Sequence, residues 1–260
     1  MIRALIVAFA SLIASGCGLP SAVDAAPFGA RLVESPFPDG VYCGLDDDED
    51  GLLVIRSAEE EGDNNCAALT WDASRRLFIM TDESDDAKAP GKLALADLGD
   101  GLLLLQFEER PEDDLSEKPW SLMVGMVQGD FIGILPLVSD QRAVDLAASY
   151  PSITLSKHHI PFMTPSVPAD APPGIEPPQS AHHYVSAGAP EDVRSLARDI
   201  ALMMLRAIVA EANNKGPLPA HGAFLPGLVR VEAGVPDHPP SPAQMRDIDA
   251  LMAKLRVLAE

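Results

Sequence analysis

Basic residues are scarce in this chain, and their scarcity limits the partners that it can bind. Its 260 residues include 19 Lys and Arg against 39 Asp and Glu, a formal net charge of −20. Such a field repels nucleic acid and anionic lipid headgroups, so neither is expected to bind the folded chain. It favours a basic or peptide-like partner instead. The other interpretation is that the charge serves solubility alone.

Recognisable catalytic patterns are absent as well. There is no Gly-x-Ser-x-Gly elbow, Walker loop, dinucleotide glycine fingerprint or His-Glu-x-x-His helix. Carboxylates are too numerous for any pair to be singled out as an acid and a base. A serine, a histidine and an aspartate could still meet from distant positions, for example Ser156 and His158, but spacing alone does not show this. We therefore do not expect an enzyme.

No apolar run is long enough to span a membrane as a helix, which takes about 20 apolar residues. The N-terminus carries a shorter one: Arg3 precedes the apolar segment Ala4–Ile13, and small residues then lead into Cys17. A basic start, about ten apolar residues and a small-residue end are typical of a secretory signal. The sequence therefore predicts export.

Ser15-Gly16-Cys17 resembles the lipobox of bacterial lipoproteins, in which the cysteine is diacylated and becomes the new N-terminus. The resemblance covers Met1–Gly18 and implies a signal peptide at 1–16 and lipidation of Cys17. It contains no Asp after the cysteine to retain the protein at the inner membrane, which implies the periplasmic face of the outer membrane. The alternative is cleavage at Val23-Asp24-Ala25, which would leave a soluble periplasmic protein.

There are only three cysteines, and they suit an oxidising compartment. If Cys17 carries lipid, Cys43 and Cys66 remain as an even pair. A disulfide between them would close a loop of about 24 residues and add roughly 3 kcal/mol by restricting the unfolded chain. Two buried free thiols are the alternative.

Most of the negative charge lies in a segment whose pattern predicts β-structure. From Glu34 to Glu117 there are 24 acidic and 6 basic residues, a net charge of −18. Short apolar runs alternate there with acidic or glycine-containing turns. The predicted strands are Val41–Leu45, Leu52–Arg56, Cys66–Trp71, Leu77–Met80, Lys92–Ala96, Leu102–Phe107, Ser121–Val127 and Phe131–Val138. We expect an antiparallel meander or small barrel, or a sandwich, over 39–138.

The acidic turn after Leu45 matches the first half of a calcium loop through Asp46, Asp48, Asp50 and Gly51. Hard cations take clustered carboxylate oxygens, and the glycine permits the sharp turn. The match fails at Ser57, where such a loop closes with a bidentate Glu. A Ca²⁺-responsive module therefore competes with a simple acidic turn that keeps a strand edge soluble. No other cofactor is expected.

The rest of the chain predicts helices around a proline-rich connector. Ser139–Ser149 favours a short helix, and seven prolines between Pro161 and Pro178 favour an extended segment. Longer helices are expected at Pro190–Asn213 and Pro242–Leu258, the second with a capping box from Ser241 to Gln244. The fold class is therefore α+β. Its expected parts are the signal peptide 1–16, a lipid-anchored tether 17–38, the β domain 39–138, the short helix and connector 139–189, and a helical segment 190–260 packing on the β domain.

The six histidines all lie in the second half of the chain, at His158, His159, His182, His183, His221 and His238. Adjacent residues of an extended chain face opposite ways, so neither neighbouring pair chelates a metal alone. The two pairs flank the proline-rich segment and could meet to bind zinc or copper, with Met163 as a soft ligand. Surface or hydrogen-bonding histidines are the other interpretation.

These patterns together predict an exported cell-envelope lipoprotein with a non-enzymatic binding or accessory role. Its expected contacts are the membrane, through the lipid anchor, and a basic or peptide-like envelope partner. Two alternatives stay open: an envelope hydrolase with a site assembled from the histidine-containing loops, and a Ca²⁺-responsive binding module.

Overall fold

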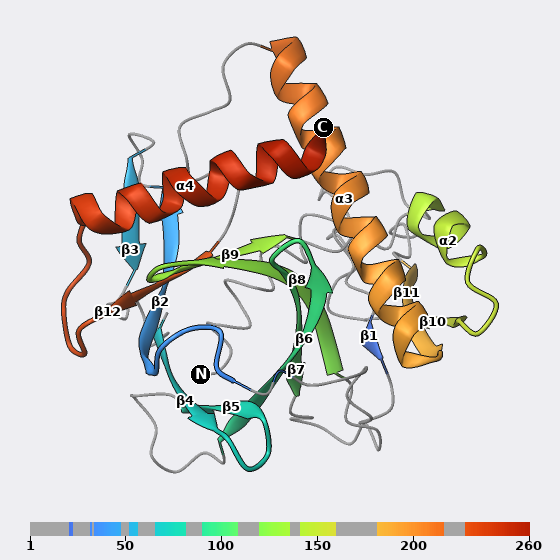
Figure 1. Ribbon diagram of the computed structural model, residues 1–260, viewed down its shortest axis with the longest axis horizontal. Coiled ribbons are helices and arrows are strands. Elements are labelled where there is room, and N and C mark those ends of the chain that lie inside the picture. The colour runs from blue at the N-terminus through green and yellow to red at the C-terminus, as the bar shows by residue number, and fades with distance from the viewer. Residues whose placement is uncertain are drawn as a thin grey trace, which may run out of the picture.

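The computed structural model describes residues 21–22, 32, 34–47, 52–56, 66–81, 90–108, 120–135, 141–159, 181–215 and 227–260. Within them the chain is an α+β protein with antiparallel strands, which confirms the expected class (Figure 1). The strands are β1 (Ser21–Ala22), β2 (Gly40–Asp47), β3 (Leu53–Arg56), β4 (Cys66–Asp72), β5 (Leu77–Thr81), β6 (Gly91–Gly99), β7 (Leu102–Glu108), β8 (Trp120–Gln128), β9 (Phe131–Leu135), β10 (Thr154–His159), β11 (Ala181–Ala187) and β12 (Gly227–Val231). The helices are α2 (Gln141–Ala147), α3 (Pro190–Lys215) and α4 (Pro242–Ala259).

Eight of these strands form a closed antiparallel barrel in the order β8-β7-β6-β5-β4-β2-β12-β9, closed by the pairing of β8 with β9. Of the arrangements expected, the small barrel is present, and the meander and the sandwich are wrong. The physical reason is the non-local strand β12. It comes from the C-terminal part of the chain and inserts between β2 and β9, so the barrel edges are paired.

Strand β7 shows how the barrel wall is built. Leu103, Leu105 and Phe107 join the apolar cluster inside the barrel, whereas Leu102 and Leu104 join the cluster on its outer face. Successive strand residues face opposite sides, so a strand buried on both faces needs a continuous apolar run. The four consecutive leucines of β7 meet that requirement.

The segment before β2 closes one end of the interior. Phe37 is buried and stacks on Phe78 of β5, with ring centroids 4.3 Å apart. Leu32 packs on the same cluster and donates its N–H to the carbonyl of Leu95 in β6 at 3.3 Å. Figure 1 shows this blue segment in the mouth of the barrel. The last residues of the expected tether, 17–38, are thus packed into the barrel.

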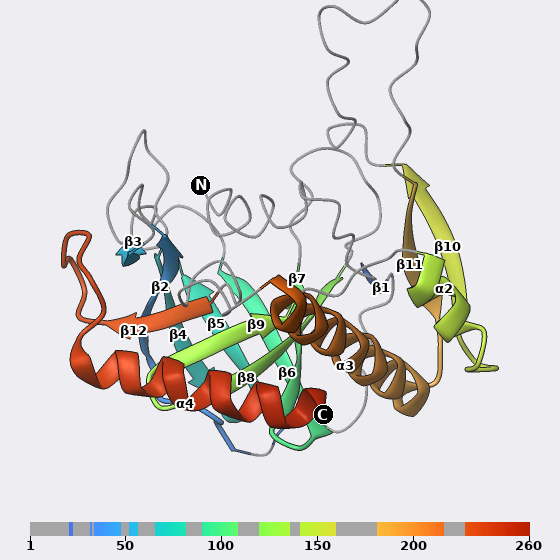
Figure 2. The same ribbon diagram turned by 90° about the horizontal axis from the view of Figure 1, so that it is seen from above.

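Helices α3 and α4 cover part of the outer face (Figures 1 and 2). Helix α4 lies over β8 and β9, and α3 lies over β6, β7 and β8. The outer cluster joins Leu104 and Val124 of the wall to Leu196 and Ile200 of α3 and to Leu251 of α4. Burial of such an apolar stripe contributes most of the stability of a helix in a folded protein. None of the helices in the described part of the chain has the length and hydropathy needed to cross a membrane.

The N-terminus of α4 is also oriented by polar contacts. Ser241 and Gln244 form the predicted capping box: the Ser241 hydroxyl accepts the Gln244 N–H, and the Gln244 side chain accepts the Ser241 N–H. The Gln244 amide also donates to the carbonyl of Arg230 in β12 at 2.9 Å. One turn later, the Asp247 carboxylate accepts the N–H of Asp130 in the β8–β9 turn at 3.2 Å. These bonds position α4 on the barrel.

A smaller group of strands extends from β8. Strand β1 pairs with the first residues of β8, β11 pairs with β1, and β10 is the outermost strand. The short helix α2 lies beside α3, and after it the Tyr150 hydroxyl donates to the Asp199 carboxylate of α3 at 2.6 Å. Figure 2 shows β10, β11 and α2 on the opposite side of the molecule from β3 and β12.

Candidate functional site

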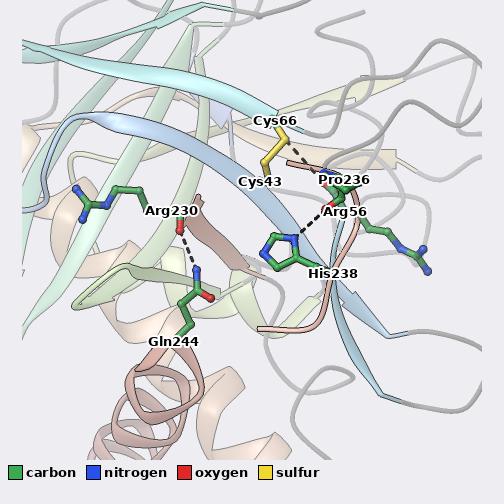
Figure 3. Close-up of a disulfide and its surroundings, with 7 residues drawn as sticks. All are labelled: Cys43, Arg56, Cys66, Arg230, Pro236, His238 and Gln244. Atoms are coloured by element: carbon green, nitrogen blue, oxygen red, sulfur yellow. Dashed lines mark hydrogen bonds between the residues drawn. A yellow bond between two sulfur atoms is a disulfide. The ribbon is translucent and has the colours of Figure 1, made fainter. Parts of the chain in front are cut away.

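The disulfide between Cys43 and Cys66 defines one corner of the barrel (Figure 3), and it is the pairing that the sequence analysis expected. It joins directly opposed residues of β2 and β4, with Cα atoms 4.1 Å apart. Both cysteines are buried on the outer face, where they pack with Leu53 and Ile55 of β3. The bond therefore acts as a covalent crosslink within the outer apolar cluster.

The loop between β12 and α4 pairs with β3 beside this disulfide. Ile55 donates its N–H to the carbonyl of His238 at 2.9 Å and accepts the His238 N–H at 3.4 Å. Next to it, the half-buried Arg56 pairs with Asp237, with Nη1 and Oδ2 3.3 Å apart. The His238 ring places Nδ1 2.8 Å from the carbonyl oxygen of Pro236, within hydrogen-bonding distance (Figure 3). These contacts join the C-terminal part of the chain to β3.

The hydrolase alternative requires a histidine within hydrogen-bond reach of a nucleophile and an acid. His238 is the histidine with a described side chain, and the contact seen for its ring is with a backbone carbonyl. The structure does not describe the side chains of the other five histidines, and it does not describe His221 at all. A hydrolase site therefore stays a prediction.

The expected calcium residues fall partly within the described chain. Strands β2 and β3 form the predicted hairpin, in which Asp46 lies opposite Val54. Asp46 is therefore a residue of an extended ladder, whereas a calcium loop bends its first ligand around the ion. Asp48 and Asp50, between β2 and β3 in the sequence, lie outside the described residues. The calcium interpretation stays a prediction.

Strands β10 and β11 place two of the histidine pairs side by side. His158 lies directly opposite His182, while His159 lies opposite Ala181 and His183 lies opposite Lys157. The sequence allowed the two pairs to meet but indicated neither strand, because their polar composition lacks an apolar alternation. Met163, the suggested soft ligand, lies outside the described residues.

The described side chains inside the barrel pack against one another in one apolar cluster. It contains an apolar cavity of about 10 Å³, lined among others by Phe37, Leu69, Met80 and Leu105. A water molecule needs roughly 10–15 Å³, and small-molecule pockets measure about 300–1,000 Å³. Tyr42 also lines the cavity, and its hydroxyl donates to the Pro38 carbonyl at 2.8 Å. Burial raises the pKa of Tyr42, so its phenol is neutral.

The structure was also searched for metal-binding groups and for the expected lipidation site. Among the side chains that the structure describes, no group of three or more His, Cys, Asp or Glu is placed to hold a metal ion. Cys17, the expected lipidation site, lies outside the described residues.

Comparisons with protein-family models, with curated proteins and with solved structures found no match for this chain.

Proposed function

We propose that this chain is an exported cell-envelope lipoprotein with a non-enzymatic binding or accessory role, anchored at the periplasmic face of the outer membrane. The observation that carries the proposal is Ser15-Gly16-Cys17 directly after a basic residue and a short apolar run. A diacyl group on Cys17 would be a firm anchor, since each buried CH₂ adds about 0.8 kcal/mol and two chains add together.

The cysteine arrangement supports export. Disulfides persist in oxidising compartments such as the periplasm and are rare where thiols are kept reduced. Cys43 and Cys66 are bonded to each other, and Cys17 is the third of the chain's three cysteines. Lipidation of Cys17 would thus leave no unpaired thiol in an oxidising compartment.

The barrel topology supports a binding role at one end of the barrel. Short turns join β4 to β5, β6 to β7 and β8 to β9, and in an antiparallel barrel they all lie at the same end. Strand β2 therefore ends, and strands β4, β6 and β8 begin, at the opposite end. The sequence segments that adjoin these strand ends are 48–52, 57–65, 82–90 and 109–119, and they contain 16 acidic and 3 basic residues.

We refer to these four segments as the acidic end. Their charge favours a basic partner and raises its local concentration through electrostatic attraction. The cavity lined by the described side chains inside the barrel supports the same location, because at about 10 Å³ it is too small for a ligand. The proposed partner is therefore a basic peptide or protein segment held at the acidic end.

The anchor is tested by the mass of the mature protein from membranes of a Gram-negative host, without reduction. We expect cleavage before Cys17, a diacyl mass on that residue and an intact Cys43–Cys66 link. The Cys17→Ser variant should lose the acyl mass and leave the membrane fraction. An unmodified N-terminus near Ala26 would replace the anchor with soluble export, and retention of Met1 would overturn export itself.

Binding at the acidic end is tested with a fluorescent oligolysine peptide. A variant with Glu112→Gln, Asp113→Asn, Asp114→Asn and Glu117→Gln should bind several-fold more weakly than the native chain. The matched control carries Asp97→Asn, Glu191→Gln, Glu232→Gln and Glu260→Gln, four exposed carboxylates outside the acidic end with the same total charge. Binding should weaken from about 0.05 to 0.5 M salt, as the Debye length shortens. Equal losses in both variants would show that net charge alone attracts the peptide.

A further inference from the structure

Four histidines meet on β10 and β11, and the strand register distributes them unequally over the two faces of this pair. Residues directly opposite each other share a face, and successive residues alternate between faces. His158 and His182 are register partners and so share one face. His159 and His183 lie on the other face, each opposite a residue that is not histidine.

The two faces differ in their surroundings. Leu155 and Val185, which are also register partners, join the apolar cluster beneath the helices. Alternation places Lys157, His159 and His183 on that same core-facing side of the strands. His158 and His182 therefore occupy the face turned away from the core, together with the register partners Ser156 and Tyr184.

The register of His158 and His182 is suited to metal chelation. Directly opposed residues of an antiparallel pair have Cβ atoms about 4.5–5.5 Å apart. Two imidazole nitrogens that share a metal lie no more than about 4 Å apart, since each is about 2 Å from the ion. Imidazole is the ligand type that copper, nickel and zinc share. The opposite face lacks this arrangement and places Lys157, a cation, directly across from His183.

We propose that His158 and His182 form a two-histidine site for a divalent transition-metal ion on the outward face of β10 and β11. The remaining coordination positions are open to water or to an incoming ligand. The ion would crosslink β10, the outermost strand of the sheet, to β11, and would stabilise the pairing of these strands by binding the folded state alone. This site is independent of the acidic end and of the lipid anchor.

Titration of the purified mature protein with Cu²⁺, followed by electron paramagnetic resonance, tests the site. Copper(II) is the best probe because it binds nitrogen ligands most tightly among the first-row divalent metals. We expect one ion bound with nitrogen couplings from two imidazoles. His158→Asn and His182→Asn should each weaken binding at least tenfold and remove one of the couplings.

The matched controls are His159→Asn and His183→Asn, the same substitution one residue away on the other face. Both should bind copper like the native chain. Circular dichroism checks that each variant folds, and Zn²⁺ should raise the melting temperature of the native chain and of His159→Asn but not of His158→Asn. Equal losses in all four variants, or copper binding unaffected by His158→Asn, would overturn the proposal.

Discussion

The inner and outer faces of the barrel wall are both apolar, but they are buried in different ways. The side chains on the inner face pack against inner-face side chains of the other strands and against Phe37, so their burial follows from closure of the barrel. The outer face is covered by α3 and α4, which lie more than fifty residues later in the chain than the last locally paired strand, β9. The inner core therefore depends on strand register, and the outer core depends on docking of the helices.

Leu104 and Leu105 allow the largest test of this comparison. They are neighbours in β7, both are leucine and both are buried, but Leu104 faces the helices and Leu105 faces the interior cavity. Each change to Ala should lower the free energy of unfolding by about 2–5 kcal/mol. Leu105→Ala should cost more, because it enlarges an existing cavity in a closed wall that cannot collapse. Urea denaturation measures both, and a larger loss for Leu104→Ala would reverse the comparison.

Gly129, in the β8–β9 turn, tests the docking of α4. Its φ of +56° lies in the left-handed region, and an added Cβ would clash with the Asp247 carboxylate of α4. Gly129→Ala should therefore cost more than the ~1–2 kcal/mol of backbone strain alone. The control is Gly101→Ala, at φ +79° with its nearest contact, Met126, at 3.8 Å.

If the close approach of α4 is the cause, Asp247→Ala should recover part of the loss in Gly129→Ala. Thermal unfolding of the single and double variants measures this recovery. Equal losses for Gly129→Ala and Gly101→Ala, with no recovery, would show that backbone strain alone accounts for the effect.

Two tyrosines give a smaller test, through pH. Burial raises the pKa of Tyr42 in the interior, and burial together with the Asp199 carboxylate raises the pKa of Tyr150, on the outside, to about 12. Tyrosine in an unfolded chain has a pKa of about 10. The folded state therefore favours the neutral phenol, and this stabilisation is complete below pH 10 and is lost as the pH rises above it.

The free energy of unfolding should consequently fall between about pH 10 and 12. Tyr42→Phe and Tyr150→Phe should each flatten the fall, and their combination should flatten it most. Denaturation at several pH values measures the slope, which is independent of any constant loss from the missing hydroxyl. A double variant with the native slope would rule out these phenols as its source.

Local pattern predicted most of the elements. All eight strands expected between Val41 and Val138 appear as β2 to β9, and the helices expected from Pro190 and Pro242 begin at those residues. Ser241 and Gln244 form the capping box as predicted. These signals are reliable because apolar runs, turn residues and caps act within a few residues of one another.

The candidate sites were predictable in part. The Cys43–Cys66 disulfide was predictable, because two cysteines remain once Cys17 is assigned to the lipobox of the signal peptide. The face shared by His158 and His182 could not be predicted, since it depends on which residues of two polar strands lie opposite each other. Such pairing is set by tertiary contacts on either side, here those of Leu155 and Val185.

The sequence by itself determined the α+β class, seven of the eight strands of the wall, the starts of the two long helices and the disulfide partners, because each depends on local composition or on a pair of cysteines. Only the tertiary structure decided that the wall closes into a barrel. Closure requires β12, a five-residue strand inserted between β2 and β9 from far along the chain. No local pattern specifies such a pairing, because its free energy comes from partners that are distant in sequence.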